Sequence, residues 1–135
     1  MARTVTGKYR EFGLLVLRAG VGGMFVYHGL PKVLGGPPLW EKLGTAMAHV
    51  GIGFVPVLWG FMAAVAETVG GACLVLGVFF RVACVILLAT MSVAAAMHIG
   101  KGEGLKAASH AMEAGIVFFS LLLTGPGKYS IGKNK

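Results

Sequence analysis

Glu67 and His28 are proton-transfer groups that stand inside or beside long apolar runs of this sequence. Glu67 is the one charged residue between Phe54 and Phe80, and His28 ends the apolar run of the first thirty residues. A carboxyl group in an apolar environment must hold a proton or a cationic partner, and histidine exchanges protons near neutral pH. We therefore predict Glu67 and His28 as the catalytic residues, acting as proton donor and acceptor.

Height along helices brings further polar groups close to this pair. At 1.5 Å per residue, His28 and Glu67 lie within about 3 Å of one another in height, while Lys32 starts about 9 Å above Glu67 and must reach down. We expect a cationic group of the segment HGLPK, residues 28–32, to contact Glu67. By the same measure the other helices add polar groups at or just below this level. The predicted ligand-binding residues are Lys32, His98, His110 and Glu113.

Each of these residues also has a structural interpretation. Arg18 and Glu113 differ by about 6 Å in height, a gap that a long arginine spans, so we predict an ion pair locking the first helix to the fourth. Lys32 can simply extend to the membrane interface, and His28 can be a hydrogen-bonding residue there. A contact between Glu67 and HGLPK can equally serve as a clamp between two helices.

The same residue types raise the question of a metal. Histidine and glutamate are common ligands, and His110 and Glu113 share one helix face. A carboxylate-bridged metal pair needs a second Glu-x-x-His and further carboxylates, which the sequence lacks. We therefore expect neither a metal nor haem. Cys73 and Cys84 lie at different heights and are expected to be packing residues, not a disulfide.

The composition shows what must position these groups. Of 135 residues 56% are hydrophobic and 13% are charged, and the mean hydropathy is +0.81. A soluble domain carries roughly a quarter charged residues. The apolar runs are long enough, or nearly so, to cross about 30 Å of hydrocarbon as helices. The sequence therefore indicates a membrane protein.

We predict an all-α fold in a single domain, residues 1–135, as an antiparallel bundle of four transmembrane helices. The segment 39–50 repeats apolar residues at helical spacing and is predicted as a short interfacial helix between the first two spans. Within HGLPK, Gly29 allows close helix approach, and Pro31 is expected to end the first helix at Leu30. The predicted spans are 11–30, 54–80, 81–98 and 105–123.

Basic residues predict the orientation. Seven lie on the side of the two termini, and four lie on the other side, which places both termini in the cytoplasm. No basic stripe is interleaved with aromatic residues, so a nucleic-acid partner is not expected. The partner that the net charge of +7 does indicate is the lipid bilayer. The seven residues are Arg3, Lys8, Arg10, Arg81, Lys128, Lys133 and Lys135.

Three segments resemble the DoxX family of small prokaryotic membrane proteins: LLVLRAGVGGMFVYHGLPKVLGG, AETVGGACLVLGVFFRVACVILL and LLLTGPGKYSIG. The resemblance implies a four-helix bundle in the cytoplasmic (inner) membrane. Some members are subunits of thiosulfate:quinone oxidoreductase, and others associate with superoxide dismutase and sulfurtransferase. The recurrent family positions fall here on Arg18, His28, Gly29, Lys32, Glu67, Gly70, Gly71, Gly77, Arg81, Gly125, Pro126 and Gly127.

Three functions follow as alternatives. The resemblance implies a membrane subunit of a redox complex, with quinone as its cofactor and with further copies or redox proteins as partners. A scaffold without chemistry is the second alternative, since catalytic thiols and metal motifs are missing. A small proton-coupled transporter is the third, because a lone glutamate in a membrane helix is what proton exchange requires.

Overall fold

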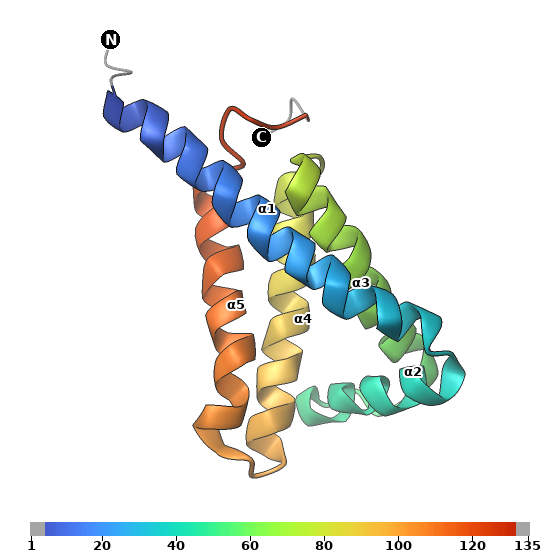
Figure 1. The fold of residues 1–135 in the computed structure, drawn as a ribbon. Coiled ribbons are helices and arrows are strands. Elements are labelled where there is room, and N and C mark those ends of the chain that lie inside the picture. Colours follow the sequence, from blue (N-terminus) through green and yellow to red (C-terminus); the bar gives the residue numbers. More distant parts are fainter. Residues whose placement is uncertain (1–4, 132–135) are drawn as a thin grey trace.

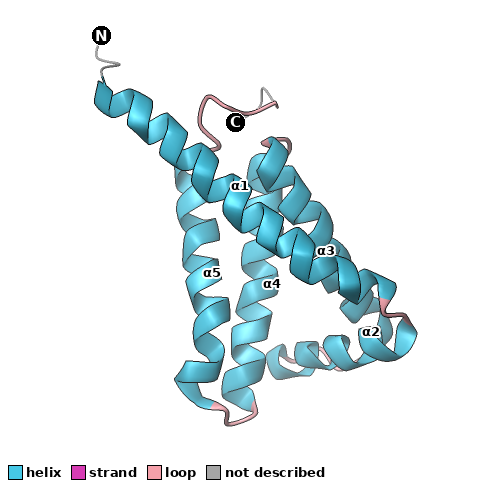
Figure 2. Ribbon diagram, viewed as in Figure 1, coloured by secondary structure: helices cyan, strands magenta, loops and turns pink. Residues whose placement is uncertain are grey.

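The computed structural model describes residues 5–131, and within that range every regular element is a helix (Figure 2). Four of these described helices are long and apolar enough to cross a membrane: α1, Val5–Leu34; α3, Pro56–Leu76; α4, Phe80–Gly100; and α5, Gly104–Thr124. The predicted all-α fold with four membrane-spanning helices is confirmed. Arg3, Lys133 and Lys135, which entered the charge count, lie outside the described residues.

A short helical segment connects α1 to α3, as predicted for 39–50. It consists of α2, Pro37–Gly44, followed by a 3₁₀ helix, η1, over Thr45–Val50. Pro37 begins α2, where a missing N–H is harmless. Gly51 ends η1 in the left-handed region, with a φ of 90°, which glycine adopts without strain.

The helices form a triangular frame (Figure 1). From the short turn at 77–79, α3 and α4 diverge, and α2 with η1 crosses their wide end. Helix α1 runs obliquely across this frame and packs on α3, while α5 lies beside α4. The first turns of α1 and the segment that follows α5 lie at the same end of the bundle, here called the terminal end, as an even number of crossings requires.

The core lies mainly between α4 and α5, and Leu74 of α3 is packed into it. Phe80, Leu87 and Phe118 are fully buried there. Phe25 of α1 joins them, with its ring centroid 5.0 Å from that of Phe118 in an edge-to-face contact. Lys32, in the last turn of α1, lies toward the opposite end of the bundle.

The prediction that Pro31 ends the first helix is wrong. Helix α1 continues through Pro31 to Leu34. Proline cannot donate to the preceding turn, but its fixed φ is close to the helical value, so the backbone can continue for a last turn. That turn is held from outside: the carbonyl of Lys32 accepts hydrogen bonds from the Gly35 N–H (3.2 Å) and from Trp40 Nε1 (2.9 Å).

Candidate functional site

Lys32 and Glu67 form an ion pair between α1 and α3. Lys32 Nζ lies 3.0 Å from Glu67 Oε1 and 3.2 Å from Oε2, so the ammonium group donates to both carboxylate oxygens. Glu67 is 6% exposed, whereas the side chain of Lys32 is 34% exposed. The expected contact between Glu67 and HGLPK is confirmed, and Lys32 makes it.

Glycines bring α1 and α3 close enough for this pair to form. A Cβ atom on Gly29 would stand 2.6 Å from Thr68 Oγ1 and 2.9 Å from Glu67 Cβ. Further along the crossing, a Cβ on Gly22 would stand 2.5 Å from the Gly71 carbonyl oxygen, and one on Gly71 would stand 2.6 Å from the Gly22 oxygen. Because real Cβ atoms do not approach this closely, each position requires glycine.

Helix α2 fixes the backbone on which Lys32 stands. Trp40 Nε1 donates to the Lys32 carbonyl, and the Trp40 ring lies 4.8 Å, centroid to centroid, from that of Phe61 on α3. The backbone of Trp40 rests directly on Gly60, where a Cβ would stand 1.6 Å from the Trp40 oxygen. Sequence analysis missed Trp40. The sequence feature that could have indicated it is a tryptophan in the predicted interfacial helix, since the indole N–H usually donates a hydrogen bond at a polar–apolar boundary.

His28 lies one helical turn before Lys32 on α1. Its ring is exposed, and it contacts the rings of Tyr27 (5.5 Å between centroids) and His110 of α5 (6.3 Å). Two of the predicted histidines, from α1 and α5, are therefore brought together. The catalytic roles predicted for Glu67 and His28 stay predictions.

The other predicted ligand residues lie apart from this pair. His98 Nδ1 is 2.5 Å from Oε1 of Glu103, in the loop between α4 and α5. The hydrogen bond from His98 lowers the pKa of the Glu103 carboxyl, despite a small opposing effect of desolvation. Glu113 is exposed on α5. Among residues 5–131, no hydrogen bond or ion pair links His98 or Glu113 to Lys32 or Glu67.

The predicted ion pair between Arg18 and Glu113 is wrong. Arg18 is 1% exposed, and its Nη1 donates to the carbonyl oxygens of Leu74 (3.4 Å) and Val75 (3.5 Å) in the last turn of α3. Glu113 is on α5, while Arg18 is packed between α1 and α3. Axial height alone could not show which neighbour Arg18 faces.

Arg18 satisfies carbonyl groups that the end of α3 leaves without helical partners. The last four carbonyls of a helix lack them. Cys73 O accepts from the Gly77 N–H at 2.7 Å, and Leu76 O accepts from the Ile131 N–H at 3.0 Å. Arg18 Nη1 donates hydrogen bonds to the two carbonyls between them, those of Leu74 and Val75. A cation is also favoured at a helix C-terminus by the helix dipole.

A second polar group at the terminal end was not predicted. Glu11 is 5% exposed, and its carboxylate accepts from the Lys128 N–H at 2.8 Å and from Arg10 Nη2 at 2.9 Å. It thereby ties the segment after α5 to α1. Arg81 donates to the carbonyl of Leu122 in the last turn of α5. The signal for Glu11 was an acidic residue at the very start of an apolar run.

Within the described part of the chain, no group of three or more His, Cys, Asp or Glu side chains is placed to hold a metal ion. Cys73 and Cys84 are free thiols.

The four apolar helices define a small multi-pass membrane protein, in which an ion pair joins α1 to α3. The DoxX family model matches residues 13–99, well over half of the chain. The chain belongs to the DoxX family, as the three sequence segments indicated. The matched range includes Arg18, Lys32 and Glu67, and it ends before α5. No curated protein and no solved structure matches this chain.

Proposed function

We propose that this protein is a membrane subunit of a redox complex and that Lys32 and Glu67 bind the headgroup of a quinone. The observation that carries the proposal is the geometry of the ion pair. An ammonium group has three N–H donors, and the two oxygens of Glu67 take two of them. The third has no partner among the described residues, on a side chain that is one-third exposed.

The donor set fits a quinone. Quinone carbonyl oxygens are hydrogen-bond acceptors, and a lysine held by a buried carboxylate presents a donor in a fixed position. The headgroup is amphipathic and its tail is apolar, so a site inside a membrane-spanning bundle can be reached from the lipid. When bound, a quinone supplies two-electron chemistry that is coupled to the uptake or release of two protons.

The proton-handling groups stand in sequence around this site. Glu67 holds the lysine, His28 lies one turn from Lys32, and His110 lies 6.3 Å from His28 between ring centroids. In this proposal Glu67 and His28 exchange protons with the bound headgroup. His110 and the exposed ring of His28 pass those protons toward the surface.

The electrons come from a partner in this proposal. Cys73 and Cys84 are separate free thiols, and neither lies beside the ion pair. A single four-helix chain has little interior of its own, so a homo-oligomer or a complex with redox proteins completes the assembly. The excess of basic residues at the terminal end supports a cytoplasmic position for that end, in a prokaryotic inner membrane.

The test is quinone retention by the full-length chain purified from its membranes in mild detergent. Wild-type protein should carry quinone, Lys32→Met should lose it by about tenfold or more, and Lys42→Met should retain it. Lys42 is a matched control, because it is an exposed lysine on α2 outside the ion pair. A double variant, Lys32→Met with Glu67→Gln, leaves no unpaired charge and should also lose quinone.

Glu67→Gln tests the proton role separately, since the amide keeps the shape and can still accept from Lys32. The assembled complex should then turn over more slowly, with an altered pH profile. Full activity with an unchanged profile would remove the proton role. Substrate-driven proton flux in liposomes without bound quinone would favour a transporter. If a folded sample shows neither bound quinone nor proton flux, the result would favour a scaffold without chemistry.

A further inference from the structure

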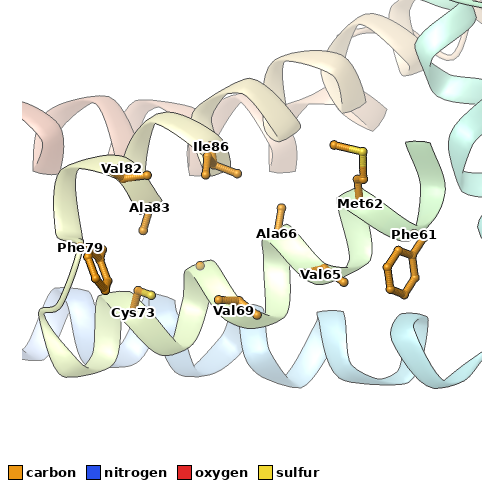
Figure 3. A pocket seen from close by; sticks show the side chains of 11 residues that line it. Phe61, Met62, Val65, Ala66, Val69, Cys73, Phe79, Val82, Ala83 and Ile86 are labelled. Carbon is orange, nitrogen blue, oxygen red and sulfur yellow. The ribbon is translucent and has the colours of Figure 1, made fainter. Parts of the chain in front are cut away.

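An apolar groove runs along the face between α3 and α4 (Figure 3). Its volume is about 450 Å³. The small lining residues Ala66, Gly70 and Ala83 are buried or partly buried and form the floor, whereas most of the larger apolar side chains are exposed and form the rim. Phe79 at the narrow end and Val82 beside it are strongly exposed, at 76% and 59%.

The groove lies inside the membrane-spanning part of the protein. Ten of its eleven lining residues belong to α3 and α4, and Phe79 stands in the turn that joins them. No lining side chain carries nitrogen or oxygen, and the sulfur atoms of Met62 and Cys73 are the most polar atoms of the side chains (Figure 3). An occupant at this depth must be apolar along its whole length, because the lining offers no hydrogen bond.

The dimensions of the groove fit a single hydrocarbon chain. From Phe61 to Cys73 the groove follows α3 for about 18 Å at 1.5 Å per residue. Dividing the volume of about 450 Å³ by that length gives a mean cross-section of roughly 25 Å². A hydrocarbon chain, about 4 to 5 Å thick at carbon contact distance, needs less than about 20 Å².

Charge at the terminal end indicates the headgroup. The narrow end of the groove is the α3–α4 turn, and Arg81 directly precedes the lining residue Val82. Lys128 belongs to the segment after α5, which crosses this end. In the same segment, the Ile131 N–H donates a hydrogen bond to the Leu76 carbonyl. With Lys8 and Arg10 on the first turns of α1, the charged side chains described at this end are mostly basic. Basic side chains at an interface attract anionic headgroups.

We propose that the groove between α3 and α4 binds one acyl chain of an anionic phospholipid, whose headgroup lies at the terminal end. The site is separate from the Lys32–Glu67 pair, because α1 packs on Glu67, Thr68 and Gly71, and the groove uses other faces of α3. The proposal of lipid binding in the groove is therefore independent of the proposal of quinone binding at the ion pair.

Cys73 reports on occupancy directly. It lines the groove and is partly exposed, whereas Cys84 is fully buried. In a Cys84→Ala background the full-length chain carries one thiol. After removal of lipid, a lipophilic maleimide should label Cys73 quickly. Incorporation into phosphatidylglycerol vesicles should slow labelling by about tenfold relative to detergent alone.

A matched pair of variants tests the binding volume. Ala66→Leu fills the floor of the groove, while Ala89→Leu adds the same atoms to an exposed position of α4 outside it. In native mass spectrometry, wild type and Ala89→Leu should each retain one phospholipid. Ala66→Leu should retain about tenfold less, because the added carbons occupy space that the chain would fill.

The outcomes separate the candidate occupants. Equal retention of phosphatidylglycerol and phosphatidylcholine would overturn the headgroup assignment, since one basic contact should give a preference of roughly fivefold. Quinone retained in place of phospholipid and lost on Ala66→Leu would overturn the choice of lipid. Protection of Cys73 only in a dimer would make a second copy the occupant. Unchanged labelling, with no retained lipid in wild type, would overturn the site as a whole.

Discussion

Removing the lysine of the Lys32–Glu67 pair should destabilise the protein more than removing a surface lysine. Lys32→Met keeps the length and the apolar stem of the side chain, but it leaves a carboxylate that is 6% exposed without its cation. Deleting one partner of a fully buried pair costs about 3–5 kcal/mol. Because the Lys32 side chain is 34% exposed, solvent screens part of this loss, and we expect about 2–3 kcal/mol.

A double-mutant cycle isolates the pair. Glu67→Gln removes the charge, and the combined variant with Lys32→Met leaves neither charge behind. We expect the double variant to be less destabilised than the sum of the singles by about 1–2 kcal/mol, within the range for residues in direct contact. Lys42→Met, on the exposed side of α2, should change stability by less than about 0.5 kcal/mol.

The assay is reversible unfolding in mixed micelles, followed by circular dichroism, with the free energy of unfolding compared among the five proteins. Additivity of the two single variants within about 0.5 kcal/mol would show that Lys32 and Glu67 are not energetically coupled. A Lys32→Met variant as stable as Lys42→Met would refute the reasoning more directly. Either result would mean that the contact does not hold α1 against α3.

Three further outcomes are expected from the same assay. Gly60→Ala should destabilise the protein by about 1–3 kcal/mol, because its Cβ would meet the α2 backbone at 1.6 Å; Gly23→Ala, with nothing within 4 Å, should be neutral or stabilising by up to about 1 kcal/mol. Arg18→Met should cost about 1–3 kcal/mol, since two buried carbonyls lose their donor, and a neutral result would contradict its capping role. The pKa of Glu103 is lowered from its usual 4.5 by the hydrogen bond from His98. The stabilisation that this hydrogen bond adds is therefore complete above pH 4.5, the unfolded pKa of Glu103. It is lost as the pH falls through the lower pKa that Glu103 has in the folded protein. Glu103→Gln should flatten that part of the stability profile, and an unchanged profile would show that the interaction adds nothing.

The sequence predicted the elements well because their cause is local. A run of apolar residues long enough to cross the bilayer is read from composition alone, and the amphipathic segment 39–50 shows its own periodicity. The contact between Glu67 and HGLPK was also predictable, because a lone carboxylate in an apolar run requires a partner. The choice of Lys32 over His28 was open, since both stood within reach.

The errors share one cause, which is that side-chain partners depend on how helices cross. Height along each helix was compared as if the axes were parallel, but α1 runs obliquely over the frame (Figure 1). Arg18 consequently meets the end of α3, where carbonyls without helical partners accept its hydrogen bonds. Pro31 was expected to end α1 on propensity alone, whereas Trp40 of α2 supports the last turn from outside.

The two ends of the bundle use their polar residues differently, and this difference supports the proposed site at Lys32 and Glu67. At the terminal end Arg18, Arg81 and Glu11 all bond to backbone groups that the helix ends and the final segment leave unsatisfied. Such contacts are required for folding in an apolar environment. The Lys32–Glu67 contact joins two side chains and satisfies no backbone group.

Apolar residues of similar volume could replace a buried ion pair at little or no cost in stability. Folding alone therefore gives no reason for a carboxylate in the middle of α3 or for an ammonium group in the last turn of α1, whereas the carbonyls at the end of α3 account for the Nη1 donor of Arg18. Lys32 keeps one-third of its side chain exposed, which a clamp between helices does not require. Burial of the carboxylate together with access to the ammonium group is what binding of a polar headgroup requires, and it favours a binding site at Lys32 and Glu67 over a structural clamp.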